Sequence, residues 1–299
     1  MARSVLKLPC IFLCLVINLT NSFCFAEQYE APLRDSYSYF GLGLDFLYYE
    51  ENTAKKLAGE TVDIETVTNI NITQQSGAYA SVNRDWGFYL VTASTLGESS
   101  VDETWLVNDT AIRRNKVAFQ RLRLGFLGTR LLRGSHYLVL GGHYTNTEYK
   151  RFAGEFTSAA ANLGIDENDF TQGAIIEKVW DVSGVIGYEY STFFTKRTPG
   201  WNFQVQALLG VPLITSVSNT DVNKGGSIVE NYSGIQLRMN AGVGYQFHPK
   251  AIAALALEFG YLRRDASDNK YLDAAGNTTE LPETVVMYVY PRFVMSWSF

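Results

Sequence analysis

Hydrophobic and polar residues alternate along much of the chain with a period of two. Between Trp201 and Val211 every second residue is apolar, and most of the intervening residues are Asn, Gln or Gly. Successive side chains of a β-strand point to opposite faces, so the pattern predicts strands with one apolar and one polar face. Ten segments fit this description: Tyr37–Glu51, Ile72–Arg84, Trp86–Glu98, Ile112–Gly128, His136–Lys150, Ala174–Thr192, Gly200–Thr215, Glu230–Phe247, Ala251–Arg264 and Glu283–Phe299.

The last segment, Glu283–Phe299, ends the chain on an aromatic residue. Chain ends are usually polar and frayed, which makes an apolar terminal strand unusual. The segment resembles the C-terminal strand of bacterial outer-membrane β-barrels, whose final aromatic residue is the sorting signal. The resemblance implies that the barrel-assembly machinery is a partner of Phe299. Taken alone, the segment is also compatible with an edge strand of a soluble domain.

The connections between the segments alternate between short and long. Short turns are predicted around Asp85, Thr129–Ser135, Ser191–Pro199 and His248–Lys250. With an even number of strands both termini lie on one side, so the short turns are periplasmic and the long loops extracellular. In lipid every backbone group must be paired, which requires a closed barrel. The sequence therefore predicts an all-β fold, a single closed antiparallel transmembrane barrel of about ten strands in the outer membrane of a Gram-negative cell. Eight and twelve strands are the alternatives.

Residues 1–26 are predicted to be a secretory signal peptide, with the barrel in residues 27–299. Arg3 and Lys7 precede a short apolar core, and Cys24-Phe25-Ala26 fits a cleavage site. All three cysteines lie in this segment. The mature chain is therefore not expected to carry a disulfide or a cysteine-based metal site, and no cofactor is indicated.

Charge narrows the choice of partners and of lumen contents. Without Arg3 and Lys7, 23 of the 25 Lys and Arg remain against 30 Asp and Glu, a net charge of −7 that argues against nucleic-acid partners. Mixed charges in a barrel too narrow for an open pore are expected to pair. We therefore predict a salt-bridged lumen, with a narrow channel as the alternative. The charged residues on the predicted polar faces are Asp45, Arg121, Arg123, Asp181, Glu189, Arg238, Glu258 and Arg292.

Two short motifs lie in the predicted extracellular loops. Val101–Leu106 reads Val-Asp-Glu-Thr-Trp-Leu, and Ser218–Asn223 reads Ser-Asn-Thr-Asp-Val-Asn. The first is similar to the Val-Asp-x-Asp-Trp-Met segment of the omptins, and the second to their Asp-x-His segment. The Gly-Tyr and the proline of Gly244–Pro249 also match the omptin pattern. Omptins are ten-stranded outer-membrane aspartyl endopeptidases. The resemblance implies an Asp–His pair that activates water, opposite a pair of aspartates.

The chain departs from this pattern at two of the four positions. Asp102 and Asp221 match, but Thr104 replaces the second aspartate and Asn223 replaces the histidine. Asn cannot act as a general base, so Glu103 and His143, the latter on a predicted lumen face, are candidate replacements. The candidate catalytic residues are thus Asp102, Glu103, Asp221 and His143. A chance match of the aspartates is the alternative.

The incomplete motif favours a non-enzymatic barrel with a structural or interaction role at the cell surface. An endopeptidase with a shifted site is the first alternative, and a narrow channel is the second.

Omptins also bind lipopolysaccharide through a Tyr-x-Glu-x-Arg run, and the comparable stretch here, Tyr144–Glu148, lacks the cation. Lys150 and Arg151 follow it and are candidates for phosphate contacts, or for solvated charges at the rim. Glu155–Leu163 is predicted to be helical.

Overall fold

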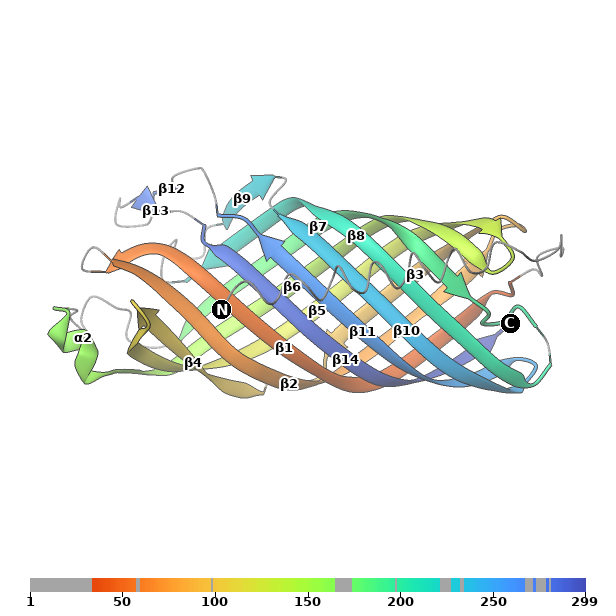
Figure 1. Ribbon diagram of the computed structural model, residues 1–299, viewed down its shortest axis with the longest axis horizontal. Coiled ribbons are helices and arrows are strands. Elements are labelled where there is room, and N and C mark those ends of the chain that lie inside the picture. Colours follow the sequence, from red (N-terminus) through yellow and green to blue (C-terminus); the bar gives the residue numbers. More distant parts are fainter. Residues whose placement is uncertain are drawn as a thin grey trace. The chain divides into compact units, whose positions relative to one another are not determined.

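The described part of the chain is almost entirely β-structure (Figure 1). The computed structural model describes residues 34–57, 60–97, 99–164, 174–196, 198–220, 227–231, 234–266, 271–272, 278–279 and 281–299. Its elements are β1 (Tyr37–Leu57), β2 (Glu60–Ser81), β3 (Trp86–Thr95), β4 (Ser100–Val107), β5 (Thr110–Arg133), β6 (His136–Phe156), α2 (Ser158–Asn162), β7 (Ile175–Ser191), β8 (Gly200–Asn219), β9 (Ser227–Asn231), β10 (Ile235–His248), β11 (Ala251–Arg264), β12 (Tyr271–Leu272), β13 (Thr278–Thr279) and β14 (Glu283–Ser298).

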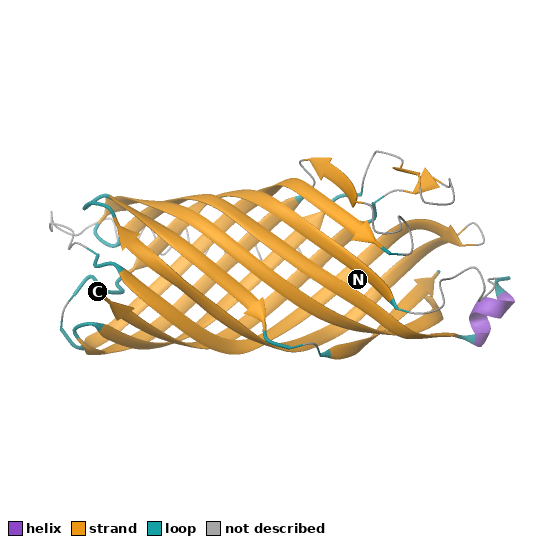
Figure 2. Cartoon of the chain, turned by 180° about the vertical axis from the view of Figure 1, so that it is seen from behind, coloured by secondary structure: helices purple, strands orange, loops and turns teal. Residues whose placement is uncertain are grey.

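The strands form a closed antiparallel barrel. Hydrogen bonds link β1, β2, β3 with β4, β5, β6, β7, β8, β10, β11 and β14 in a ring, and β14 pairs back onto β1. Phe40 lies opposite Met295 and Tyr48 opposite Met287 in this closing pair. Figure 2 shows the tilted strands wrapping a single barrel. The prediction of a closed ring of about ten strands is confirmed among the described residues.

The third strand of the ring is interrupted. β3 pairs with residues 122–130 of β5, the part nearer the chain termini. β4 pairs with residues 110–118 of β5, the part farther from the termini, and so takes the place of β3 there. A two-residue turn then joins β4 to β5, with Asn108 at φ 48° and Asp109 at φ 60°, a left-handed conformation that these residues tolerate. The prediction that Val101–Leu106 lies in a loop was therefore wrong, because these residues extend a β-hairpin beyond the apolar band.

Several strands are longer than the sequence pattern predicted. β1, β2, β5 and β6 all reach further from the termini than expected, and β5 runs to Arg133 where a turn from Thr129 was predicted. Glu230 belongs to β9, which pairs with β8 outside the ring, and not to the β10 strand. The helix predicted at Glu155–Leu163 is shorter, Ser158–Asn162. The long connections on the side away from the termini, here called the mouth, are thus partly built of strand ribbons.

The outer surface is a band of exposed apolar side chains. On β1 these are Phe40, Leu42 and Leu44, and aromatic pairs such as Trp201–Tyr245 and Tyr144–Trp180 border the band on either side. Apolar surface of this extent, framed by aromatic residues, belongs in hydrocarbon. The described part of the chain contains no helix long and apolar enough to cross a membrane.

Candidate functional site

The lumen near the chain termini is filled by one arginine in an aromatic cage. The Arg34 guanidinium lies 4.4 Å from the centre of the Tyr79 ring and 5.3 Å from the rings of Tyr37, Tyr89 and Tyr137. Its Nη1 donates to Glu189 Oε1 at 2.7 Å, and Tyr89 donates to the same oxygen at 2.7 Å. These residues, here called the Arg34 plug, close this end of the lumen.

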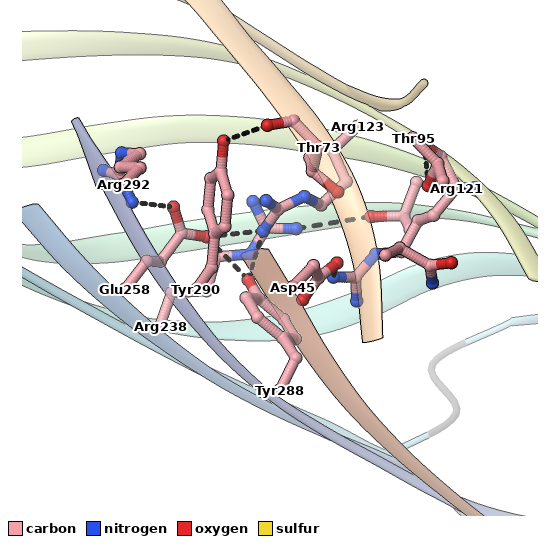
Figure 3. Close-up of polar contacts among 12 residues, drawn as sticks. Asp45, Thr73, Thr95, Arg121, Arg123, Arg238, Glu258, Tyr288, Tyr290 and Arg292 are labelled. Atoms are coloured by element: carbon pink, nitrogen blue, oxygen red, sulfur yellow. Dashed lines mark hydrogen bonds and ion pairs between the residues drawn. The ribbon is translucent and has the colours of Figure 1, made fainter. Parts of the chain in front are cut away.

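A second polar layer fills the middle of the barrel (Figure 3). We call Asp45, Arg121, Arg123, Arg238, Glu258, Tyr288 and Arg292 the central network. Arg123 Nη1 donates to Glu258 Oε1 at 2.5 Å and to the Tyr288 hydroxyl at 2.6 Å. Arg292 Nη1 donates to Glu258 Oε2 at 3.4 Å, and Arg121 forms an ion pair with Asp45. The predicted pairing of charges in the lumen is confirmed for Asp45, Arg121, Arg123, Glu258 and Arg292.

Arginine is in excess in the central network. Four arginines face two carboxylates among the residues described at this level, and the partners of Arg238 are neutral. Its Nη2 donates to Thr145 Oγ1 at 3.3 Å. With the Gln236 amide turned to present its oxygen, that oxygen accepts from Arg238 Nε at 2.7 Å. The layer therefore carries a surplus of two positive charges in a poorly hydrated space.

Two glycines make room for side chains of this layer. A Cβ on Gly260 would lie 2.0 Å from the Tyr288 ring, and a Cβ on Gly125 would lie 2.7 Å from the His143 ring. Any side chain at Gly260 would displace Tyr288 from Arg123 and Glu258. Glycine at such a strand position permits close approach of a neighbouring group.

A third layer lies nearer the mouth and has the opposite imbalance. One guanidinium, Arg151, meets three buried glutamates: Nε lies 2.9 Å from both Glu103 oxygens, Nη2 3.3 Å from Glu51 Oε2, and Nη1 3.5 Å from Glu177 Oε2. Tyr49 donates to Glu51, and these five residues are here called the mouth cluster. Between the two layers Arg264 holds Asp181 through two hydrogen bonds of 2.8 and 2.5 Å.

The mouth cluster lies beyond the apolar band. Glu51 is fourteen residues from Tyr37 on β1, about 32 Å along the barrel axis for a strand tilted by ~45°, against ~25 Å for the band. Charged pairs lie on the outer surface at the same level, such as Lys116 with Asp102 and Lys178 with Glu148. Burial and the neighbouring charge of Glu177 raise the pKa of Glu51 to about 7, because Arg151 is shared among three carboxylates.

Two of the candidate catalytic residues point in opposite directions. Asp102 and Glu103 are neighbours on β4, and strand alternation turns one outward and the other inward. The Asp102 side chain is 83% exposed and pairs with Lys116, whereas the Glu103 side chain is 0% exposed in the mouth cluster. The structure does not bring these two carboxylates together.

His143 lies on the lumen face of β6, as predicted, but away from Glu103. It is eight residues from Arg151 along β6, about 26 Å of strand. The fourth candidate, Asp221, lies outside the described residues. Asn219, two residues before it, donates to Glu177 Oε2 at 3.0 Å. The two segments that resemble the omptin motif thus reach the same cluster, one through Glu103 and the other through Asn219, while the catalytic assignment of the four residues stays a prediction.

Sequence reasoning missed most of the mouth cluster and the Arg34 plug. Arg151 was expected at the rim or against phosphates, but its side chain is buried in the lumen. The alternation already indicated lumen positions for these residues. Each lies an even number of residues from a predicted lumen residue on the same strand: Glu51 from Asp45, Arg151 from His143, and Glu177 from Asp181. Glu51 and Glu177 already lie within the predicted strands Tyr37–Glu51 and Ala174–Thr192, and one more residue on His136–Lys150 would have added Arg151. Among the described residues no group of three or more His, Cys, Asp or Glu is arranged to hold a metal ion.

Comparison with known proteins identifies the fold. No family model matches the chain, and no curated protein matches its sequence. Among solved structures, the outer-membrane protease OmpT from Escherichia coli is similar with a TM-score of 0.59 at 12% identity, covering 93% of this chain and 100% of OmpT. The translocator domain of the autotransporter NalP from Neisseria meningitidis (TM-score 0.36, 10% identity, 99% of this chain and 98% of that one) and the toluene transporter TodX from Pseudomonas putida (0.37, 8%, 89% and 90%) are more distant. The likeness to OmpT shows a shared outer-membrane barrel fold.

Proposed function

We propose that this chain is an integral outer-membrane β-barrel protein with a closed lumen, and that it has a structural or binding role at the cell surface. The observation that carries the proposal is the succession of polar layers across the lumen: the Arg34 plug, the central network and the mouth cluster. Each contains buried ion pairs, and removing one partner of such a pair is costly, so the layers resist opening. A barrel of this width has little space beyond its own side chains.

The surfaces available to partners follow from this placement. Phe299 is 72% exposed. We propose that this aromatic side chain is what the barrel-assembly machinery binds. Lys150 and Lys178 lie on the outward-facing positions of β6 and β7 at the level of the mouth cluster. These ammonium groups are placed to meet lipopolysaccharide phosphates, a role that Arg151 cannot share from inside the lumen.

Recording from planar bilayers tests the closed lumen. Folded wild-type protein is expected to give no steps of conductance at either polarity. The combined substitution Arg34→Ala, Arg123→Ala and Arg151→Ala removes one ion-pair partner from each of the three layers and is expected to produce a measurable leak, which shows that the assay detects an open lumen. Conductance by the wild-type protein would contradict the proposal.

The endopeptidase alternative keeps one supporting observation, the meeting of both omptin-like segments at the mouth cluster. It is tested with a dibasic fluorogenic peptide and protein refolded with lipopolysaccharide. We expect no turnover, because Asp102 and Glu103 diverge and His143 lies deep in the lumen. Turnover that disappears in Asp221→Ala, while Asp102→Asn remains active, would establish an enzyme with a different site from the one predicted.

A further inference from the structure

A cavity of about 90 Å³ lies in the lumen between the Arg34 plug and the central network. Its wall includes Tyr39, His143, Arg238, Glu258 and Arg292. The volume is that of a few water molecules or one small ion with its first hydration partners. The cavity is therefore too small for a peptide.

The charges around this cavity do not balance. Both oxygens of Glu258 are already engaged, Oε1 by Arg123 and Tyr288 and Oε2 by Arg292. Asp45 is engaged by Arg121. Arg238 has no carboxylate within ion-pair distance in the part of the chain that the structure describes, and its partners Thr145 and Gln236 carry no charge. A half-buried guanidinium inside the lumen without a counter-charge is costly, and the glutamates of the mouth cluster are too far along the strands to compensate it.

His143 supplies a second, independent indication of a ligand. Its side chain is 5% exposed, it lines the cavity, and its Nδ1 has no hydrogen-bond partner among the described protein atoms. Gly125 leaves the space that the ring occupies. In the neutral tautomer with the proton on Nδ1, this atom is a donor. Arg238, whose partners are neutral, and His143, whose Nδ1 has no partner among the described protein atoms, thus line the same small cavity.

We propose that the lumen cavity binds a small monovalent anion, such as a halide, between the Arg238 guanidinium and His143 Nδ1–H. The ion offsets part of the positive surplus of the central network and supplies His143 with an acceptor. Its role is structural: it stabilises the packed middle of the barrel. The anion enters when the barrel folds, because the polar layers on either side close the lumen.

Bromide is the probe. Wild-type protein is refolded at constant ionic strength in sodium bromide or in sodium gluconate, whose anion is too large for the cavity. We expect the unfolding equilibrium constant to fall about tenfold when bromide is at about ten times its Kd. Crystals grown in bromide are expected to show an anomalous peak beside Arg238 and His143.

Two variants make the test specific. Arg238→Gln removes the charge at similar side-chain length, and it should abolish both the bromide dependence and the peak. Arg263→Gln removes an outward-facing arginine near the rim, where it pairs with Glu283 and Asp265, and should keep both. Stability of folded wild-type protein that is the same in bromide and gluconate, or an equal bromide effect in Arg238→Gln, would overturn the proposal, as would peaks confined to the outer surface.

Discussion

The central network and the mouth cluster are built from the same residue types in opposite proportions. In the middle of the barrel four arginines face two carboxylates, whereas near the mouth one arginine faces three. Arginine does not lose its proton in a protein, so a surplus of arginine must be met by an anion or by neutral hydrogen-bond partners. A surplus of glutamate can be relieved more simply, by taking up a proton.

The difference matches the position of each layer along the barrel. The mouth cluster lies at the aqueous end of the strands, where protons exchange readily. The central network lies within the apolar band, between the Arg34 plug and the Asp181–Arg264 pair. The comparison predicts that stability should respond to pH at the mouth and be insensitive to pH in the middle.

Replacing Glu258 by Gln is expected to have the largest effect. The change keeps the size of the side chain and leaves Arg123 and Arg292 without their carboxylate. We expect a loss of about 3–5 kcal/mol in the free energy of unfolding, the usual cost of breaking a buried pair from one side. Urea titration in lipid vesicles, followed by tryptophan fluorescence, measures it.

The loss in Glu258→Gln should be the same at pH 5 and pH 8, since the stranded groups are arginines. Glu283→Gln is the matched control, because it removes an exposed carboxylate that pairs with Arg263 outside the lumen. Exposed pairs contribute little, so its effect should stay below ~1 kcal/mol. A loss of less than ~1 kcal/mol in Glu258→Gln would show that the central network does not hold the barrel together.

Replacing Arg151 by Gln should give a smaller loss that depends on pH. Without the guanidinium the pKa of Glu51, which burial and Glu177 already raise, rises further in the folded protein. Groups whose folded pKa is raised contribute stability at low pH that is lost as pH rises. We expect a loss of about 2–3 kcal/mol at pH 8, most of it recovered at pH 5, in the same urea titration. An equal loss at both pH values would contradict the contrast between the two layers.

The sequence predicted the barrel better than the site, and the reason is physical. Alternation fixes the face of each residue, so the lumen positions of Asp45, Glu258 and Arg292 follow directly from counting. Strand ends are not fixed in this way, because polar residues occur both in loops and in strands that project from the membrane. Val101–Leu106 was therefore assigned to a loop, although its alternation continues that of a strand. Arg34 was missed for another reason: it precedes the first strand and carries no periodic signal.

Replacing Glu51 tests the mouth cluster while leaving the Arg151–Glu103 ion pair in place. Its pKa is raised to about 7 in the folded protein, against 4.5 for an ordinary glutamate side chain. The stabilisation is therefore fully present below about pH 4.5 and is lost as pH rises through about 7. A shift of this size corresponds to at most about 3 kcal/mol.

Hydrogen exchange at pH 5 and pH 8 measures this effect locally, after correction for the intrinsic exchange rates. Amides at the mouth ends of β1 and β2 should be less protected at pH 8 than at pH 5, whereas those beside Asp45 should not change. In Glu51→Gln the difference between the two pH values should largely vanish, because the amide cannot ionise and still accepts from Tyr49. Asp102→Asn is the control, since this exposed carboxylate lies on the outer face of β4 and pairs with Lys116, away from the cluster. If Asp102→Asn flattened the response as well, the pH dependence would belong to the outer rim and the mouth cluster would be as insensitive to protons as the middle of the barrel.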